Sequence, residues 1–483
     1  MKKRLTIRKW NVVFFLLTTF YVVQAQEQVQ HRLTFDQYML IVRQHHPVAL
    51  QSELQPEFGE ATLRMARGSF DPKAFADLNQ KYFDGSNYYS LIDAGLKIPT
   101  WFGIELKSGF EQNQGTYLNP ENRNPDSGLW YAGISLPLGQ GLFIDQRRAE
   151  LRKAKLFNEG SEIQRQFMLN ELEYDAAKAY WEWFNAFHSN RVMQEAIELA
   201  EVRFQAVVRS AELGDRPFID TLEASIQLQQ RQQQLLQSEL DLQNTRALLE
   251  VYLWADGIIP MELAETTLPE EALEALIISD ANFPRISSNG ERLKLSDMDS
   301  LLIAHPAMVL GNLKIETLEI EARLKRELLK PSLDLQYNAL SQPIGGDPLA
   351  AYSINNYKWG IHFAMPLFLR KERGALALTE LKINESQMDL ELKRAELKFK
   401  ATSAINTWQN TRSQFQLYFR TASDFRRLLE AEQQLFFGGE SSLFMVNARE
   451  TAYINAQLKV IEIMEKNKKA QAEVKYSFAL SNM

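Results

Sequence analysis

Two segments of the chain lack both glycine and proline over an unusual length, and they limit the fold more than any other feature. One runs from Ser161 to Leu213 and the other from Ala375 to Phe437. Because glycine and proline are the residues that most often end a helix, each segment is predicted to lie in one long helix. With the flanking residues, each helix would reach roughly 100 Å at 1.5 Å per residue. Helices of that length must pack against other helices to be stable.

The chain is internally duplicated. The motif HHP, which ends at Pro47, recurs 259 residues later as AHP, which ends at Pro306. An alternating apolar stretch that ends at Pro137 recurs 229 residues later at Pro366. A repeat of this kind indicates two copies of one structural plan.

Each long run ends at a glycine turn, and a second helical run follows it. The first turn is at Gly214 and the second at Gly438 and Gly439. The runs that follow extend from Phe218 to Asp256 and from Glu440 to the C-terminus. Glycine favours the turn at the end of a helix. The sequence therefore predicts two helical hairpins, over about 145–256 and 370–480.

Segments that alternate between apolar and polar residues predict β-strands. The second repeat has two of them between about 332 and 367, including "SLDLQYNA" and "YKWGIHFAM". The first repeat has four between about 73 and 138, two of which, "YSLIDAGLKI" and "GIELKSGFE", lie in a surplus of 30 residues. Strands with one apolar face fit a soluble sandwich, and they fit equally a membrane barrel with lipid outside and water inside.

The segments outside the two repeats have their own signatures. Basic residues followed by the apolar run from Val12 to Val23 predict a secretory signal over 1–25, cleaved after Ala25. A membrane anchor is the alternative, although the run is shorter than the ~20 residues that a spanning helix needs. The predicted organisation is a signal peptide (1–25), a first repeat (26–256), a proline-rich acidic connector (257–297) and a second repeat (298–483).

Composition and motifs argue against several functions. The formal net charge of -7 leaves no basic excess to bind nucleic acid. The chain has no cysteine, so we expect neither disulfides nor a lipid on an N-terminal thiol. His45 and His46 point about 100° apart on a helix, so we expect no metal site there. The chain has no nucleophile, phosphate-loop or dinucleotide motif, so we expect no catalytic residue, no cofactor and no enzymatic activity.

Two further signals follow the first glycine turn. Leucines recur at intervals of seven from Leu228 to Leu249, with glutamines crowded around the first two. This pattern fits a glutamine-rich coiled coil, or a helix that packs on one side and lines water on the other. Asp220 and Glu223, three residues apart, share one helix face. They are either ordinary acids at a helix start or, if the helices surround a pore, an acidic collar at its gate.

Together these features resemble the TolC-like outer-membrane efflux family, from about Leu33 to Leu480. The duplicated plan carries the resemblance, with the strand-to-helix junctions "ISLPLGQGLFIDQRRAEL" at Pro137 and "FAMPLFLRKERGAL" at Pro366. The glycine turns "ELGDRPFIDTLEA" and "FGGESSLFMVNARE" add to it. The implied fold is a mixed α and β membrane protein, with long coiled-coil hairpins and antiparallel strands that pool into one trimeric transmembrane β-barrel. The connector would form the equatorial region.

The resemblance also implies a function. The chain would be a passive exit duct in the outer membrane of a Gram-negative bacterium, extending into the periplasm as a tunnel of a tripartite efflux or type I secretion system. Implied partners are two further copies of the chain, outer-membrane lipid, a periplasmic adaptor and an inner-membrane pump of RND or ABC type. The candidate gate is Asp220 and Glu223. The adaptor would contact the tips at Leu213, Gly214, Asp215, Phe437, Gly438, Gly439 and Glu440.

The chain departs from the family pattern in two respects. The second repeat has Met445 and Ala448 where the first has Asp220 and Glu223, so an acidic constriction would come from the first repeat alone. Family barrels usually take four strands from each protomer, and this chain offers six. The alternative function is a periplasmic coiled-coil scaffold or adaptor without a channel, with its strands in a soluble sandwich.

Overall fold

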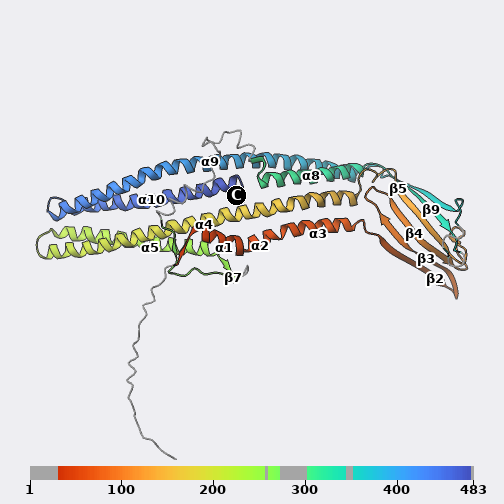
Figure 1. The fold of residues 1–483 in the computed structure, drawn as a ribbon, viewed down its shortest axis with the longest axis horizontal. Coiled ribbons are helices and arrows are strands. Elements are labelled where there is room, and N and C mark those ends of the chain that lie inside the picture. Colours follow the sequence, from red (N-terminus) through yellow and green to blue (C-terminus); the bar gives the residue numbers. More distant parts are fainter. Residues whose placement is uncertain (1–30, 256–258, 272–301, 344–346, 348–351, 480–483) are drawn as a thin grey trace, which may run out of the picture.

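The computed structural model describes residues 31–255, 259–271, 302–343, 347 and 352–479. The predicted signal peptide and most of the predicted connector lie outside the described residues. Figure 1 shows an elongated molecule with a β-sheet at one end and two helical turns at the other. The helices are α1 (Phe35–His45), α2 (Pro47–Glu53), α3 (Gln55–Gly68), α4 (Gln146–Glu212), α5 (Phe218–Glu250), α8 (Pro306–Glu327), α9 (Arg370–Phe437) and α10 (Leu443–Ser477), with a 3-10 turn at Pro120–Asn122.

The strands fall into one large sheet and two small ones. The large sheet contains β2 (Lys73–Phe83), β3 (Ser86–Pro99), β4 (Glu105–Gln114), β5 (Leu129–Pro137), β9 (Ser332–Ser341) and β10 (Tyr357–Ala364). In the small sheets, β1 (Arg32–Leu33) pairs with β8 (Leu268–Pro269), and β6 (Trp254–Ala255) pairs with β7 (Ile259–Pro260). The described part of the predicted connector, 259–271, therefore lies along the middle of the helical body.

The two long helices are observed as α4, with 67 residues, and α9, with 68 residues. α4 starts where the Asp145 side chain accepts a hydrogen bond from the backbone N–H of Arg148. Gly160 does not interrupt it. This glycine lies where α4 approaches α8, and an added Cβ atom would come within 2.9 Å of Leu313. The following helices are shorter than predicted, since α5 ends at Glu250 and α10 starts at Leu443.

The helices exchange partners halfway along the molecule. On the sheet side, α3 packs on α4, α4 on α8, and α8 on α9. On the tip side, α5 and α10 replace α3 and α8, so that α5 packs on α4 and α10 packs on both α4 and α9. The two long helices thus run through both halves, with α3 and α8 beside them on the sheet side and α5 and α10 beside them on the tip side (Figure 1).

The sheet continues the order of the helices. Its strands are all antiparallel to their neighbours, in the order β10-β9-β5-β4-β3-β2. α9 follows β10, α8 precedes β9, α4 follows β5 and α3 precedes β2, so the helix order α9, α8, α4, α3 matches the strand order. The surplus strands of the first repeat are β3 and β4, which are full members of the sheet between β2 and β5.

One face of this sheet is apolar and uncovered. Cross-strand register puts Leu106, Ile134 and Tyr337 in one row on that face. Six large apolar residues on this face are between 39 % and 69 % exposed, namely Leu78, Leu96, Leu106, Ile134, Tyr337 and Ile361. In the described part of the chain no second sheet packs on the six strands, so this chain does not form a sandwich by itself within the described residues.

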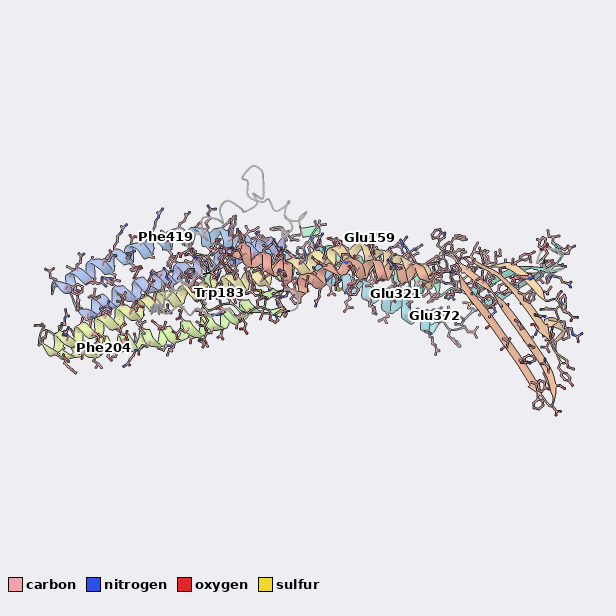
Figure 2. All side chains as sticks on the ribbon, turned by 60° about the horizontal axis from the view of Figure 1, so that its bottom comes forward. Glu159, Trp183, Phe204, Glu321, Glu372 and Phe419 are labelled. Atoms are coloured by element: carbon pink, nitrogen blue, oxygen red, sulfur yellow. The ribbon has the colours of Figure 1, made fainter. Side chains whose placement is uncertain are left out.

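The largest core lies in the middle of the helical body. Aromatic residues of α4, including Tyr180, Trp183 and Phe184, pack against Tyr38 and Val42 of α1 and against the end of α5. The Tyr180 hydroxyl also donates a hydrogen bond to the backbone oxygen of Leu33 at 2.8 Å. This cluster fastens the short N-terminal helices to the long one. Figure 2 shows Trp183 here and Phe204 nearer the tip.

Candidate functional site

The junction between β5 and α4 is built by the segment that follows Pro137. Pro137 is the last residue of β5 and lies opposite Asp334, where the sheet no longer needs its missing N–H. The backbone N–H of Leu138 then donates to Leu333 O at 2.6 Å, and that of Gln140 donates to Pro331 O at 2.8 Å. The additional "GQGL" of the first repeat therefore extends the pairing along the entry to β9.

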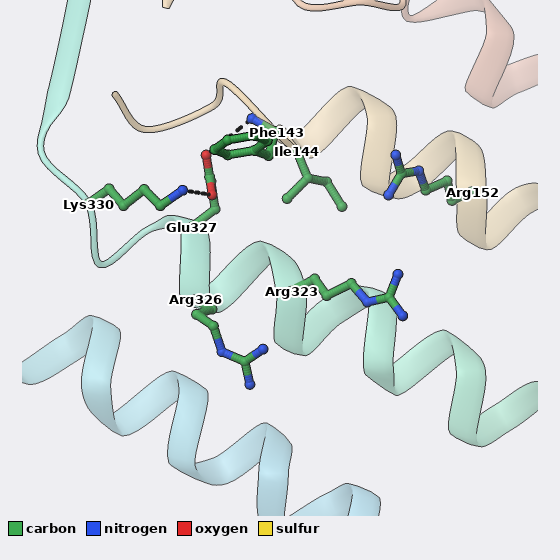
Figure 3. Close-up of a pocket in the computed structure, with 7 residues that line it drawn as sticks. All are labelled: Phe143, Ile144, Arg152, Arg323, Arg326, Glu327 and Lys330. Atoms are coloured by element: carbon green, nitrogen blue, oxygen red, sulfur yellow. Dashed lines mark hydrogen bonds and ion pairs between the residues drawn. The ribbon is translucent and has the colours of Figure 1, made fainter. Parts of the chain in front are cut away.

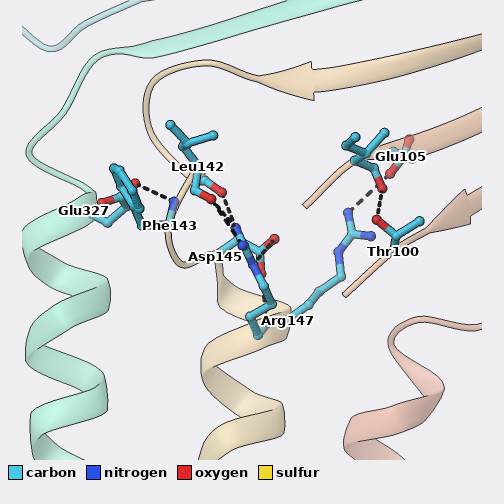
Figure 4. Close-up of polar contacts among 10 residues, drawn as sticks. Thr100, Glu105, Leu142, Phe143, Asp145, Arg147 and Glu327 are labelled. Atoms are coloured by element: carbon cyan, nitrogen blue, oxygen red, sulfur yellow. Dashed lines mark hydrogen bonds and ion pairs between the residues drawn. The ribbon is translucent and has the colours of Figure 1, made fainter. Parts of the chain in front are cut away.

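Arginines clamp the start of α4 to this junction. The buried guanidinium of Arg148 donates to the backbone oxygens of Gly141 and Leu142. Arg147 donates to Glu105 of β4 at 3.3 Å, as Figure 4 shows. The helix and three strands are thus held in a fixed relative orientation. At the other junction, Pro366 lies two residues beyond β10, and α9 starts at Arg370 without a side-chain cap.

A basic pocket of about 270 Å³ lies beside the first junction. Glu327, buried at the end of α8, accepts hydrogen bonds from the Phe143 backbone N–H at 3.3 Å and from Lys330 Nζ at 2.7 Å. Figure 3 shows the guanidinium groups of Arg152 and Arg323 between α4 and α8, with Arg326 turned away towards α9. These contacts tie the first junction to the second repeat.

The two helical turns at the tips share one geometry. Gly214 and Gly439 have φ angles of 80° and 79°, a region that favours glycine. Asp215 N–H donates to Ser210 O at 3.0 Å, and Glu440 N–H donates to Leu435 O at 2.9 Å. Gly438 has a φ of -75°, so Gly439 alone corresponds to Gly214. Two apolar side chains of these tips are strongly exposed, Leu213 at 72 % and Phe437 at 84 %.

The predicted collar residues both have partners within the chain. Asp220 pairs with Arg216 at 3.8 Å, and the guanidinium carbon of Arg216 lies 3.9 Å from the centre of the Phe436 ring on α9. Glu223 accepts a hydrogen bond from the Asn447 amide on α10 at 3.2 Å. The two carboxylates share one helix face, yet each contributes to a separate contact between the two hairpins.

A buried polar group next to these residues was missed by sequence reasoning. Arg203 of α4 forms a close ion pair with Glu450 of α10, and the Glu450 side chain is only 4 % exposed. Arg203 also donates a hydrogen bond to the Asn447 side chain at 3.2 Å. Arg231 of α5 donates to Thr451 of α10 at 2.8 Å. We call Arg203, Arg231, Asn447, Glu450 and Thr451 the clasp, because they connect the first hairpin to the second.

One signal could have revealed the clasp. Arg231 follows Leu228 by three residues and precedes Leu235 by four, so it occupies a core position of the leucine heptad. An arginine at such a position needs a buried partner. The other clasp residues have no comparable signal, because polar residues on long helices are normally exposed.

The second histidine of HHP and the histidine of AHP each start a helix. Nδ1 of His46 accepts from Val48 N–H and Nδ1 of His305 accepts from Ala307 N–H, both at 3.1 Å. Burial lowers the pKa of both imidazoles below the usual value of 6.5. Among the described residues, no group of three His, Asp or Glu side chains could hold a metal ion.

The helices of the described chain include none that combines the length and apolar character required to cross a membrane.

Comparison with known proteins supports the resemblance. The sequence profile of the outer membrane efflux protein family matches residues 298–477. Similar solved structures include the CmeC outer membrane channel of Campylobacter jejuni, with 15% identity, a TM-score of 0.63 and coverage of 92% of this chain and 85% of that chain. The open state of the Neisseria gonorrhoeae MtrE outer membrane channel has 15% identity and a TM-score of 0.65, and the match covers 92% of this chain and 88% of that chain. The outer-membrane channel OprN has 14% identity and a TM-score of 0.66, and the match covers 92% of this chain and 89% of that chain. No curated protein matches the chain significantly in sequence.

The chain therefore shares the fold of these outer membrane channel structures. The family match over residues 298–477 and these structures confirm the resemblance to TolC-like outer membrane proteins. Members of this family are trimeric channels of the Gram-negative outer membrane that work with periplasmic adaptors and inner-membrane pumps. They are transport ducts and not enzymes.

Proposed function

We propose that the chain is one protomer of a trimeric, passive exit duct of a tripartite efflux or type I secretion system. The matching order of strands and helices carries this proposal. If three copies close the sheet into a barrel, the helices continue the same wall in the same order, and the barrel opens directly into a helical tunnel. The uncovered apolar face then meets outer-membrane lipid, which agrees with its exposure. A soluble scaffold would leave that face in water.

We infer that the clasp holds the periplasmic tip closed. It joins α4 and α5 of the first repeat to α10 of the second at a place where the apolar packing is small, with Val207, Ala224, Leu429, Phe436, Leu443 and Val446 as its buried members. Separating the hairpins would break the Arg203–Glu450 pair and the Arg231–Thr451 hydrogen bond together. A periplasmic adaptor that binds the exposed tips would supply the energy for this separation. The adaptor would itself be driven by an inner-membrane pump of RND or ABC type.

Reconstitution tests the proposal. Protein purified from outer membranes is examined for its trimeric mass, and then inserted into planar lipid bilayers as wild type and as Arg203→Ala. Small discrete conductance steps that become several-fold larger in the variant are expected, because the variant releases the clasp. A folded trimer that gives no conductance steps in either form would overturn the duct, and a monomer in native membranes would overturn the barrel.

A further inference from the structure

The polar face of the sheet carries charge in an ordered pattern. Register places Lys73 opposite Lys97 and Lys97 opposite Lys107. The same row continues through Gly133 and Asn338 to Lys358 on β10, the last strand of the sheet. We call the four lysines, Lys73, Lys97, Lys107 and Lys358, the lysine stripe.

A second row of opposite sign runs parallel to it. Asp77 lies opposite Asp93, and Asp93 opposite Glu111. We call these three residues the acidic stripe. It is four residues farther along each strand, about 13 Å from the lysine stripe at 3.3 Å per residue. Because four is an even number, both stripes lie on the same face of the sheet.

Such an arrangement costs stability, because like charges directly opposite each other on neighbouring strands repel. The two stripes are too far apart to neutralise one another, and in the described chain no ion pair joins them. The nearest acid to Lys107 is Glu105, at 3.8 Å, which belongs to neither stripe. Local rules that are broken without a structural gain mark functional positions.

The structure around the stripes holds them in place. Tyr131 of β5 donates a hydrogen bond to Asp93 of β3 at 2.9 Å, and its ring crosses over the intervening Gly109 of β4. A Cβ atom at Gly109 would come within 2.6 Å of the Tyr131 hydroxyl. Lys97 Nζ lies 4.2 Å from the centre of the Phe75 ring. Gly109 therefore leaves room for the Tyr131–Asp93 hydrogen bond, which fixes the acidic stripe.

The surplus hairpin β3–β4 supplies half or more of each stripe, with Lys97 and Lys107 in one and Asp93 and Glu111 in the other. We propose that the two stripes are the charge filter of the barrel, and that this is what the additional strands contribute. The inference rests on the proposed duct. Anionic groups of a passing solute would be drawn to the lysine stripe and cationic groups to the acidic stripe. Because barrel strands tilt, both stripes would run obliquely around the lumen in three copies.

Reversal potentials in planar bilayers test the filter. The first double variant combines Lys97→Gln with Lys107→Gln, and the second combines Asp93→Asn with Glu111→Gln. The charge-conserving control combines Lys97→Arg with Lys107→Arg. In 0.1 M KCl, where the Debye length is about 10 Å, the first variant should raise the cation-to-anion permeability ratio about threefold and the second should lower it by a similar factor. This is the change expected for a shift of about half a kT in wall potential, because the shift acts on cations and anions in opposite directions. The control should stay at the wild-type ratio.

A second measurement does not depend on conductance. The chain contains no cysteine, so a single introduced cysteine is labelled without background. Asn338→Cys lies in the row of the lysine stripe and Leu129→Cys in that of the acidic stripe, opposite Glu111. At each cysteine we measure the reaction rate of a negatively charged methanethiosulfonate divided by that of a positively charged one. This ratio should be about tenfold higher at Asn338→Cys than at Leu129→Cys.

The two measurements separate the filter from the duct. Equal labelling ratios at both cysteines, or conducting channels with the same permeability ratio in all three double variants, would overturn the filter and leave the duct standing. Labelling ratios that differ as expected, in a protein that never conducts, would support the stripes and overturn the duct.

Discussion

The middle of the helical body and its tips are held together by different means. In the middle, large aromatic side chains such as Tyr180 and Trp183 are almost fully buried in one continuous cluster. At the tips, the apolar cluster has only six buried members, and the polar contacts of the clasp supplement them. Close apolar packing resists separation, whereas polar contacts can exchange with water. The difference indicates a rigid middle and tips that can separate.

The largest expected effect is in the middle. Trp183→Ala removes a side chain that is 2 % exposed and should lower the free energy of unfolding by about 3 to 5 kcal/mol. Phe204→Ala, near the tip, is the matched comparison. It should accelerate local hydrogen exchange in α4 and α5 while moving the unfolding midpoint much less, because the tip opens without global unfolding. Urea unfolding of the detergent-solubilised protein measures the loss of unfolding free energy in both variants, and hydrogen exchange measures the local opening. Equal losses would mean that middle and tip form one cooperative unit.

The clasp should give the next largest effect. Arg203→Ala leaves Glu450 buried without its partner and should cost about 3 kcal/mol, confined to the tip. Arg426→Ala, which breaks an exposed pair with Glu430, is the matched control and should cost less than about 0.5 kcal/mol. Hydrogen exchange at the start of α10 reports the difference. If both variants exchange at the wild-type rate, the clasp does not hold the hairpins.

Much of the helical part could be predicted from the sequence. Glycine and proline mark helix ends through backbone geometry, so the long helices and the turn at Gly214 follow from their positions alone. The period of two in the strands was equally readable. Which strand lies beside which could not be predicted, because pairing between β5 and β9 joins residues some two hundred positions apart. The sandwich interpretation stayed open for that reason.

The candidate site was less predictable. The glycine turns follow from backbone rules, but the stripes appear only when the register of β3 against β4 is known, because a slip of one residue would move every side chain to the other face. The histidines of HHP and AHP were visible as a repeat. Their role was not, because histidine is not among the residues preferred at a helix start and the contact depends on one ring nitrogen.

The helix starts in the middle should weaken in acid. Nδ1 of His305 accepts a hydrogen bond while Nε2 lies 3.3 Å from Tyr476 O, an arrangement that requires the neutral ring. Burial lowers the pKa of this imidazole in the folded state, so below pH 6.5 the unfolded chain takes up a proton first. Stability is then complete above pH 6.5 and falls as the pH drops towards the folded-state pKa.

His305→Asn tests this expectation, because asparagine starts helices well and does not titrate. The wild type should lose about 1 kcal/mol between pH 7.5 and pH 5.5 from this helix start, and the variant should lose less. His45→Asn, at a neighbouring position of the first repeat that starts no helix, is the control and should keep the wild-type pH dependence. Thermal unfolding midpoints at the two pH values measure the difference. An unchanged slope in His305→Asn would assign the acid sensitivity elsewhere.

The smallest effect concerns the turn of the second tip, where two adjacent glycines form a matched pair. Gly439→Ala forces an alanine to a φ of 79°, which costs roughly 1 kcal/mol although no atom lies within 4 Å of its added Cβ. Gly438→Ala, at a φ of -75°, keeps a helical backbone and should be neutral or slightly stabilising. The Glu440 N–H, which donates to Leu435 O, should therefore exchange about fivefold faster in the first variant only. Equal acceleration in both would mean that the left-handed backbone at Gly439 is not what holds the turn, and no acceleration in either would mean that the tip is already open in solution.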